Sequence, residues 1–366
     1  MEFGLSEDDR LLQDSVSRFL AAEVPLDRVR ALAAAGVEGA GFDSTLWQGL
    51  ADLGVLGLVV PERFGGSGQG FFLAALVAEA LGGVVAPAPY VGTITAAWAL
   101  LLGGSAAQQE QALPEIVRGK RRYALALAEA VAPRQNAGLK REGHTLHGES
   151  LCLIDALPAT HILLATDDGV LGMVEQGAAG LAMRPMQTID KTRSWGLLQA
   201  GGAVFEPLGG DMPHAQLLRR TLAAARVLLA ADTLGAAQVM LDKAVAYAKE
   251  RKQFSRVIAS FQAVKHMCAE MVTELEPARS LLWYAAHAQD HVVEEADLMA
   301  CLAKAHLGDI GREIARTATE VHGGMGFTDL VGLHYWFKRV GMDRQLLGGP
   351  ELTREEAARL QGWVTA

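Results

Sequence analysis

A group of cationic, amide and aromatic side chains follows directly after a long segment with the hydrophobic pattern of a helix. It consists of Arg251-Lys252-Gln253-Phe254 and, a few residues later, Phe261-Gln262-Ala263-Val264-Lys265-His266. A guanidinium binds a pyrophosphate through forked hydrogen bonds, an amide pairs with the edge of an adenine or ribose, and a phenyl ring packs on a flat ring. These residue types together would suit a dinucleotide. They are equally typical of an ordinary basic helix end, where cations lie near the negative pole of the helix dipole.

Two further segments carry glycine-rich patterns. One is Glu320-Val321-His322-Gly323-Gly324-Met325-Gly326-Phe327, and the other runs from Leu53-Gly54-Val55-Leu56-Gly57-Leu58 through Pro61-Glu62 to Gly65-Gly66-Ser67-Gly68. With the Arg-x-x-Phe and Phe-Gln pairs described above, these segments closely resemble the acyl-CoA dehydrogenase family of flavoproteins. The three matches occur in the family's order and cover nearly the whole chain.

The resemblance implies a fold, a reaction and a cofactor site. The fold would be mostly α with a β middle domain: an all-α N-terminal domain, a β-barrel-like domain and a C-terminal four-helix bundle. The reaction would be α,β-desaturation of an acyl-CoA thioester, with FAD as the hydride acceptor. In the family, the C-terminal elements reach across a dimer to the neighbour's adenosine and pyrophosphate. The residues at those positions here are Arg251, Gln253, Phe254, Phe261, Gln262, Glu320, Gly323 and Gly324.

The resemblance also implies a glutamate base in one of two places. One place, in the loop before the last helix, corresponds to Gly348, and the other, early in the long helix beside Arg226, corresponds to Ala225. Neither side chain can accept a proton, so no catalytic residue is identified. Glu351 and Asp232 are the nearest acids that could replace the base.

The middle of the chain departs from the family as well. Relatives carry a Thr-Glu-Pro-rich loop that wraps the flavin, whereas this chain has Ala128-Glu129-Ala130-Val131-Ala132-Pro133-Arg134-Gln135-Asn136-Ala137-Gly138. The family's Trp-Ile-Thr/Ser segment is replaced by Cys152-Leu153-Ile154. A flavin held there would lose a stacking ring and a hydroxyl partner.

This combination resembles the base-less subunit of the heterotetrameric acyl-CoA dehydrogenases of bacterial steroid side-chain degradation. Ala86-Pro87-Ala88-Pro89-Tyr90, Asp190-Lys191-Thr192-Arg193 and Gly348-Gly349-Pro350-Glu351 are similar to that subgroup. Such a subunit would complete a partner's FAD site in a dimer of dimers. Two alternatives stay open: a homomeric dehydrogenase with a relocated base, and a non-catalytic scaffold with the same fold. The segment Arg193-Ser194-Trp195 would lie either near the acyl or CoA channel or in a surface turn.

The hydrophobic pattern divides the chain into domains at 1–121, 122–212 and 213–366. In the first, Ser6 with Asp9 predicts a helix start, Ser44 predicts a second helix cap and Gly54 a helix end. In the second, short apolar runs predict strands at Tyr123–Leu127, His144–Leu146, His161–Ala165, Val170–Val174 and Ala203–Phe205, with a turn at Asp167-Asp168-Gly169. In the third, helices are expected at His214–Glu250, Ser260–Gln289 and Glu294–Val321, and from about Leu352.

Composition narrows the class of protein. The 366 residues allow two or three packed layers, and the formal charge of −9 argues against general nucleic-acid binding. Cys152, Cys268 and Cys301 lack metal-site spacing and predict reduced thiols. The acidic start lacks the pattern of a secretory signal, and the apolar run 222–231 is too short to span a membrane. The sequence therefore predicts a soluble cytoplasmic protein without a metal.

Overall fold

The chain begins with helices that pack on one another before the sheet starts. A computed structural model describes residues 4–35, 42–135 and 137–364 of the chain, so Asn136 of the loop considered above lies outside the described residues. The helices of this part are α1 (Glu7–Glu23), α2 (Leu26–Ala34), α3 (Ser44–Asp52), α4 (Phe71–Gly83), α5 (Tyr90–Gly103) and α6 (Ala106–Val117). Nearly every residue of α4 and α5 is buried, on all sides of each helix. These two helices are therefore the core of this part, and the others cover them.

Side-chain caps explain where two of these helices begin. Ser6 and Asp9 form a reciprocal capping box, with the Asp9 N–H donating to Ser6 Oγ over 3.1 Å, as predicted. The cap predicted at Ser44 is wrong. Asp43 holds that place, because its carboxylate accepts from the N–H groups of Thr45 and Leu46, both at 3.0 Å, while Ser44 is already helical. Helix α2 was not expected from the sequence.

The glycine-rich loop after α3 is held by its own backbone. Gly54 follows the helix end with a left-handed φ of 75°, as predicted. The N–H groups of Gly66, Ser67 and Gly68 donate to carbonyls of the same loop. A Cβ on Gly66 would lie 2.0 Å from the Val60 carbonyl oxygen, so the two stretches of backbone touch there. These N–H groups are not free to cradle a phosphate.

One curled sheet occupies the middle of the chain. Its strands are β1 (Tyr123–Ala126), β2 (Gly138–Glu142), β3 (Thr145–Ile154), β4 (His161–Ala165), β5 (Leu171–Glu175), β6 (Leu181–Pro185), β7 (Trp195–Val204) and β8 (Glu206–Pro207), in the order β6-β7-β3-β1-β4-β5-β8 with β2 on β3. β1 and β4 run parallel, and the other pairs are antiparallel. A short helix, α7 (Ala128–Val131), follows β1.

The predicted strands are all present, although two are much longer than expected. β3 and β7 pair along most of their lengths with register shifts, and the sequence pattern identified only the first residues of β3 and the last residues of β7. The turn at 167–169 joins β4 to β5, as predicted. β2, β6 and β8 were not expected. β2 carries three charged residues, and β6 ends in Arg184 and Pro185, of which proline weakens a strand pattern.

The last part of the chain is a helical bundle. It comprises α8 (His214–Glu250), the hairpin β9 (Lys252–Gln253) and β10 (Arg256–Val257), α9 (Gln262–His291), α10 (Ala296–His322), a 3₁₀ turn (Gly323–Phe327), α11 (Leu333–Gln345) and α12 (Pro350–Leu360). The predicted helices are confirmed to within a few residues, and α11 was not expected. Pro277 lies inside an unbroken α9. The fold class, mostly α with a β middle, is confirmed.

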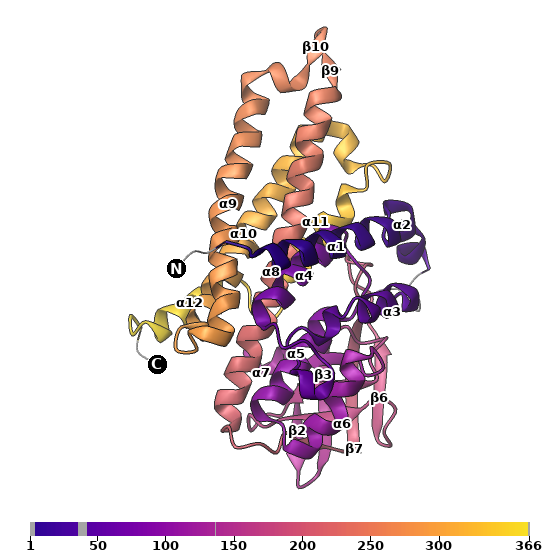
Figure 1. The fold of residues 1–366 in the computed structure, drawn as a ribbon, viewed down its shortest axis with the longest axis vertical. Coiled ribbons are helices and arrows are strands. Elements are labelled where there is room, and N and C mark those ends of the chain that lie inside the picture. The colour runs from indigo at the N-terminus through magenta and orange to yellow at the C-terminus, as the bar shows by residue number, and fades with distance from the viewer. Residues whose placement is uncertain (1–3, 36–41, 136, 365–366) are drawn as a thin grey trace.

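Helix α8 is the axis of the molecule. Among the described residues it is long and apolar enough to cross a membrane, but 89% of its apolar window is buried inside the protein, against α4, α5, α9, α10 and α11. This burial is that of a core helix. Figure 1 shows the sheet near one end of α8 and the β9–β10 hairpin projecting from the other end. The hairpin, which carries the Arg-x-x-Phe motif, and the sheet, which carries the segments that depart from the family, therefore lie far apart within one chain.

Candidate functional site

The candidate cofactor-binding residues gather at the tip of the β9–β10 hairpin. Arg251 directly follows the last residue of α8, and its backbone is extended there, with ψ of 127°. Phe254 and Ser255 turn the chain with left-handed φ values of 51° and 63°. A bulky residue at positive φ is uncommon and strained, yet Phe254 remains 88% exposed. The ring is exposed at the turn of the β9–β10 hairpin, and this hairpin projects at one end of the molecule (Figure 1).

Phe254 is part of a small aromatic and cationic surface. The ring centroids of Phe254 and Phe261 are 6.1 Å apart in an edge-to-face arrangement, and the Arg256 guanidinium lies 4.0 Å from the Phe261 centroid. Gln262 opens α9 and contacts His266 through its amide, at 3.0 Å. Arg256 was not among the expected site residues. In the structure it pairs with Gln253 across the two-residue turn of the hairpin.

Arg251 is exposed, and no ion pair of its guanidinium is found within the described part of the chain. A simple basic helix end, in which the cation lies near the negative pole of the helix dipole, therefore stays open. The exposed guanidinium and rings also form a surface that could bind an anion and a flat ring together.

The Gly-Gly turn lies at the same end of the bundle as the hairpin. Tyr247 near the end of α8 and His322 at the end of α10 stack with ring centroids 4.6 Å apart. Arg251 and Gly323 follow these two residues within about a helical turn, so both elements start from one stacked pair. Gly323 has φ of 59°, and nothing lies within 4 Å of a Cβ built at Gly323 or Gly324. The turn therefore leaves open space beside its backbone.

Glu320 precedes this turn on the last part of α10. Its side chain is 55% exposed and lies 3.6 Å from the Arg316 guanidinium, one helical turn earlier. Beyond the glycines, Phe327 is 82% exposed. The structure thus brings the predicted residues of the turn and of the hairpin to one exposed end of the bundle, away from the sheet of the same chain.

The two expected base positions carry no acid and are tightly packed. Ala225 is fully buried on α8. Gly348 has φ of 103°, and its carbonyl accepts a hydrogen bond from the Lys304 ammonium at 3.1 Å. The Arg226 guanidinium donates to the adjacent Leu347 carbonyl at 2.9 Å. Burial lowers the pKa of Lys304 to about 7. Buried cations therefore hold the loop in which relatives would carry a catalytic carboxylate.

The two proposed substitutes for the base are poorly suited to the task. Glu351 is 74% exposed at the start of α12 and pairs with Arg344 at 2.9 Å. Asp232 is buried and pairs with Arg339 at 3.2 Å and Arg193 at 3.3 Å. Burial alone would raise the pKa of Asp232, but the two arginines outweigh it and hold the pKa below its usual value. A carboxylate held in two buried ion pairs is a weak proton acceptor.

Asp232 belongs to a buried cluster of ionic side chains, which we call the junction cluster. Its members are Arg193, Arg339, Asp155, Asp190, Asp232 and Asp343. They come from the end of β3, the segment before β7, α8 and α11, and the Asp155 carboxylate also accepts from the N–H of Gly92 on α5. Arg193 is only 4% exposed, so the surface-turn interpretation of this segment is wrong. The cluster joins the sheet to the helices before and after it.

The junction cluster contains more carboxyl groups than guanidiniums, and the pKa values of two of these carboxyl groups are raised. Burial raises the pKa of Asp343 well above its usual value, and the neighbouring Asp232 raises it further. Burial also raises the pKa of Asp155 to about 6. The pKa of Asp343 is thus shifted upward next to Asp232, whose pKa the arginines shift downward, so Asp343 is the member of this pair that takes up a proton first as the pH falls.

The segment that would wrap a flavin is bound to this chain's own sheet. Residues 128–131 form α7, whose Glu129 carboxylate accepts from Ser150 Oγ at 2.6 Å and from the Leu151 N–H at 2.9 Å. Glu129 also pairs with Arg134. Cys152 is half-buried with φ of 57°, and burial raises the pKa of its thiol. The donors on this edge of β3 are therefore occupied by internal contacts.

Comparisons with known proteins bear on this arrangement. Family models described as the N-terminal and C-terminal domains of acyl-CoA dehydrogenase match residues 6–120 and 215–361. Acyl-CoA dehydrogenase IpdE2 of Mycobacterium tuberculosis is 31% identical, over 98% of this chain and 98% of that protein. Its counterpart in Mycolicibacterium smegmatis is 29% identical, over 98% of this chain and 100% of that protein.

Solved structures of the same kind superpose on nearly the whole chain. A point variant of the Tcur3481-Tcur3483 steroid ACAD gives a TM-score of 0.88 at 30% identity, covering 97% of this chain and 98% of that one. The ChsE4-ChsE5 complex of Mycobacterium tuberculosis gives 0.88 at 26% identity, covering 100% of both chains. Each of these two structures is named after two different proteins.

Proposed function

Because this chain belongs to the acyl-CoA dehydrogenase family of FAD-dependent oxidoreductases, we propose that it is the subunit that completes the FAD site of a partner dehydrogenase without having a catalytic base of its own. The observation that carries the proposal is the exposed tip of the β9–β10 hairpin, far from the chain's own sheet. A binding surface that points away from its own active-site region is useful only to a neighbour. The division of the chain at 1–121, 122–212 and 213–366 follows the same proposal.

FAD supplies the hydride acceptor of the reaction when it is bound. In the proposed arrangement Arg251 pairs with the pyrophosphate, and the amides of Gln253 and Gln262 bind the adenine or ribose edge. Phe254 and Phe261 cover the flat adenine ring. Glu320, Gly323 and Gly324 form the second wall, where the missing Cβ atoms leave room for the cofactor to approach the backbone.

The partner would supply the catalytic glutamate and the acyl-CoA pocket in contact with the flavin. The absence of an acid at Ala225 and Gly348 supports this division of labour. The relatives described as a steroid dehydrogenase and as a two-protein complex support a heteromeric assembly that acts on a steroid-linked acyl-CoA. The three cysteines are free thiols, which fits the reducing environment of the cytoplasm.

The first test is the flavin content of the purified protein. We expect the chain alone to be colourless, and the chain co-expressed with its partner subunit to contain about one FAD per pair of unlike chains. A yellow lone chain that is bleached by an acyl-CoA would overturn the proposal, and Glu351→Gln and Asp232→Asn would then identify the relocated base. A mixed complex without flavin would point to a scaffold role.

A variant of the hairpin tests the assignment directly. Arg251→Ala in the co-expressed complex should weaken FAD retention by roughly tenfold or more, because a charge-assisted contact to the pyrophosphate is lost. Arg118→Ala is the matched control, since Arg118 is also exposed and lies at the end of α6, beside the sheet. Equal flavin content in both variants would argue against a contact between Arg251 and FAD.

A further inference from the structure

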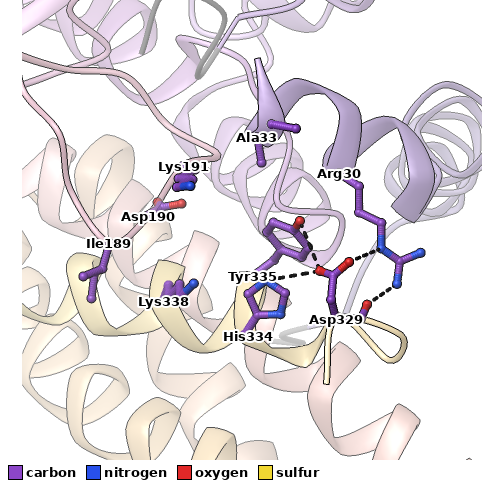
Figure 2. Close-up of a pocket in the computed structure, with 10 residues that line it drawn as sticks. Arg30, Ala33, Ile189, Asp190, Lys191, Asp329, His334, Tyr335 and Lys338 are labelled. Carbon is purple, nitrogen blue, oxygen red and sulfur yellow. Dashed lines mark hydrogen bonds and ion pairs between the residues drawn. The ribbon is translucent and has the colours of Figure 1, made fainter. Parts of the chain in front are cut away.

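A separate cleft opens between α2, the segment before β7 and the start of α11. Its volume is about 290 Å³. Figure 2 shows the side chains that line it from the three sides. They are Arg30, Ala33 and Ala34 from α2, Ile189, Asp190 and Lys191 from the segment before β7, and Asp329, His334, Tyr335 and Lys338 from the last part of the chain. The cleft is large enough for a small molecule.

The acidic groups of the cleft are already engaged. Asp190 is buried and directs its carboxylate to Arg339 at 2.9 Å and to the Thr192 hydroxyl at 2.5 Å. Asp329 lies 3.4 Å from the Arg30 guanidinium and 3.6 Å from His334. The carboxylates of Asp190 and Asp329 are therefore paired with groups other than the two lysines of the cleft, Lys191 and Lys338.

Two ammonium groups remain without an acidic partner. Neither Lys191 nor Lys338 forms an ion pair with any residue in the described ranges, and they reach the cleft from different elements. Arg30 is committed, because it pairs with Asp27 at 2.8 Å and donates to the Leu330 carbonyl at 2.8 Å. The lysines are the groups left to bind an anion.

The neighbouring imidazole reflects this excess of positive charge. Burial lowers the pKa of His334, and Lys338 lowers it further; Asp329 offsets part of this, and Arg30 and Lys191 add smaller downward contributions. A pKa below the usual value for histidine favours the neutral ring at pH 7. The His334 ring lies against Tyr335, with centroids 4.1 Å apart and the ring planes tilted by 37°. The two rings give the cleft an aromatic side beside the lysines.

Apolar side chains line other parts of the cleft (Figure 2). Ile189 is 61% exposed, and Ala33 and Ala34 add small apolar surfaces from α2. A lysine ammonium is a compact point charge that suits a phosphate, while the ring pair and Ile189 suit the organic body attached to it. A simple ion such as chloride would contact the lysines but not the aromatic and apolar side chains.

We propose that the cleft binds a small phosphorylated anion, with its phosphate between Lys191 and Lys338 and its body between Ile189 and Tyr335. This site is distinct from the hairpin surface and from the base positions, so it goes beyond the proposed completion of a partner's FAD site. Its test measures binding and does not depend on flavin or on turnover.

The test is calorimetric titration of the co-expressed complex with adenosine 5′-monophosphate, inorganic phosphate and adenosine. We expect saturable binding of the monophosphate, and each of Lys191→Gln and Lys338→Gln should weaken it by roughly tenfold through loss of a charged contact. Lys120→Gln, at an exposed lysine after α6, should bind like the parent. Thermal unfolding of each variant shows that the fold is retained.

The arms of the titration distinguish the source of the phosphate. If inorganic phosphate binds as tightly as the monophosphate, the site takes the free anion; if the monophosphate binds more tightly, the organic body contributes. Adenosine binding as tightly as its monophosphate would overturn the proposal, as would parent-like binding by both lysine variants. Binding to the lone chain that is lost in the complex would also overturn it, because the partner would then cover the cleft.

Discussion

At the scale of single residues, the expected base position Gly348 lacks more than a carboxylate. Gly348 adopts φ of 103°, where an L side chain is strained, and a Cβ there would lie 3.2 Å from Thr353 and 3.5 Å from the Arg226 guanidinium. The backbone on both sides of Gly348 has adapted to glycine and to buried cations. Restoring the acid alone therefore does not restore the geometry in which it would act.

We expect Gly348→Glu to leave the chain without dehydrogenase activity and to lower the free energy of unfolding by about 1–3 kcal/mol, because of the strained backbone. Denaturant titration and acyl-CoA bleaching of the complex measure the two effects. Gly341→Ala is the control, since Gly341 lies within α11 with open space at its Cβ and should stabilise the helix by about 0.5–1 kcal/mol. New flavin bleaching by Gly348→Glu would contradict this account.

Two neighbouring aspartates of the junction cluster should differ in their response to the same change. The pKa of Asp343 is raised, so a neutral side chain is better tolerated there, and Asp343→Asn should cost under about 1 kcal/mol. Asp232 is the ionised partner of Arg193 and Arg339, so Asp232→Asn leaves both buried guanidiniums short of a counter-ion and should cost about 3–5 kcal/mol. Urea unfolding at neutral pH compares the two, and equal costs would contradict the raised pKa of Asp343.

Asp155 should make stability depend on pH. Its folded pKa of about 6 lies above the unfolded value of about 3.9, so the folded state binds the extra proton between these values. Its contribution to stability is therefore complete below about pH 4 and is lost as the pH rises to about 6. We expect Asp155→Asn to flatten the unfolding free energy in this window relative to the parent chain. An unchanged pH profile would place the titration elsewhere.

At the scale of elements, the β9–β10 hairpin holds an exposed aromatic ring on a strained backbone. Phe254 is held at positive φ and 88% exposed, so its side chain contributes little to the fold. Natural chains keep such strain where it serves a site. The long helix α8 makes this possible, because its buried faces anchor the base of the hairpin while its end projects from the bundle (Figure 1).

Phe254→Gly should therefore separate stability from cofactor binding. We expect an unfolding free energy equal to or slightly above that of the parent, because glycine relieves the strain. FAD retention by the complex should fall by roughly tenfold, as expected for a lost stacking contact. Trp363→Ala, which removes another exposed ring beyond α12, should change neither quantity. A loss of stability without a loss of FAD would show that Phe254 has a structural role only.

At the scale of the whole molecule, the chain holds its parts together with a buried ionic cluster and leaves its binding surface at one end. The junction cluster connects the sheet with α5, the middle of α8 and α11, while the hairpin follows the C-terminal end of α8. In the proposed arrangement the cofactor surface is incomplete within one chain, and the partner subunit supplies the second half of the site.

Added FAD should stabilise the assembly and not the isolated chain. A ligand that binds only the folded complex raises its unfolding temperature with concentration, and we expect this shift for the mixed complex alone. Riboflavin is the control, because it lacks the pyrophosphate and adenosine that the hairpin would bind. An equal shift with riboflavin would mean that the hairpin does not contribute to the affinity.

Features that depend on near neighbours and residue type could be predicted from the amino-acid sequence. The capping box at Ser6, the run of α8, the turn between β4 and β5 and the absence of an acid at Ala225 and Gly348 were all readable from local pattern. The family and its fold followed from short motifs whose residues lie close together along the chain. Local propensities act over a few residues, so a linear pattern contains them.

The roles of charged residues that are far apart in sequence could not be predicted, because their contacts form only in the folded protein. Arg193 and Asp343 are 150 residues apart, and their contact turns an expected channel or surface segment into part of the core. Asp232 changed from a candidate base to a structural ion for the same reason, and the cleft of Lys191 and Lys338 was not expected at all. A carboxylate or ammonium takes its role from its burial and its partners, and folding alone brings these together.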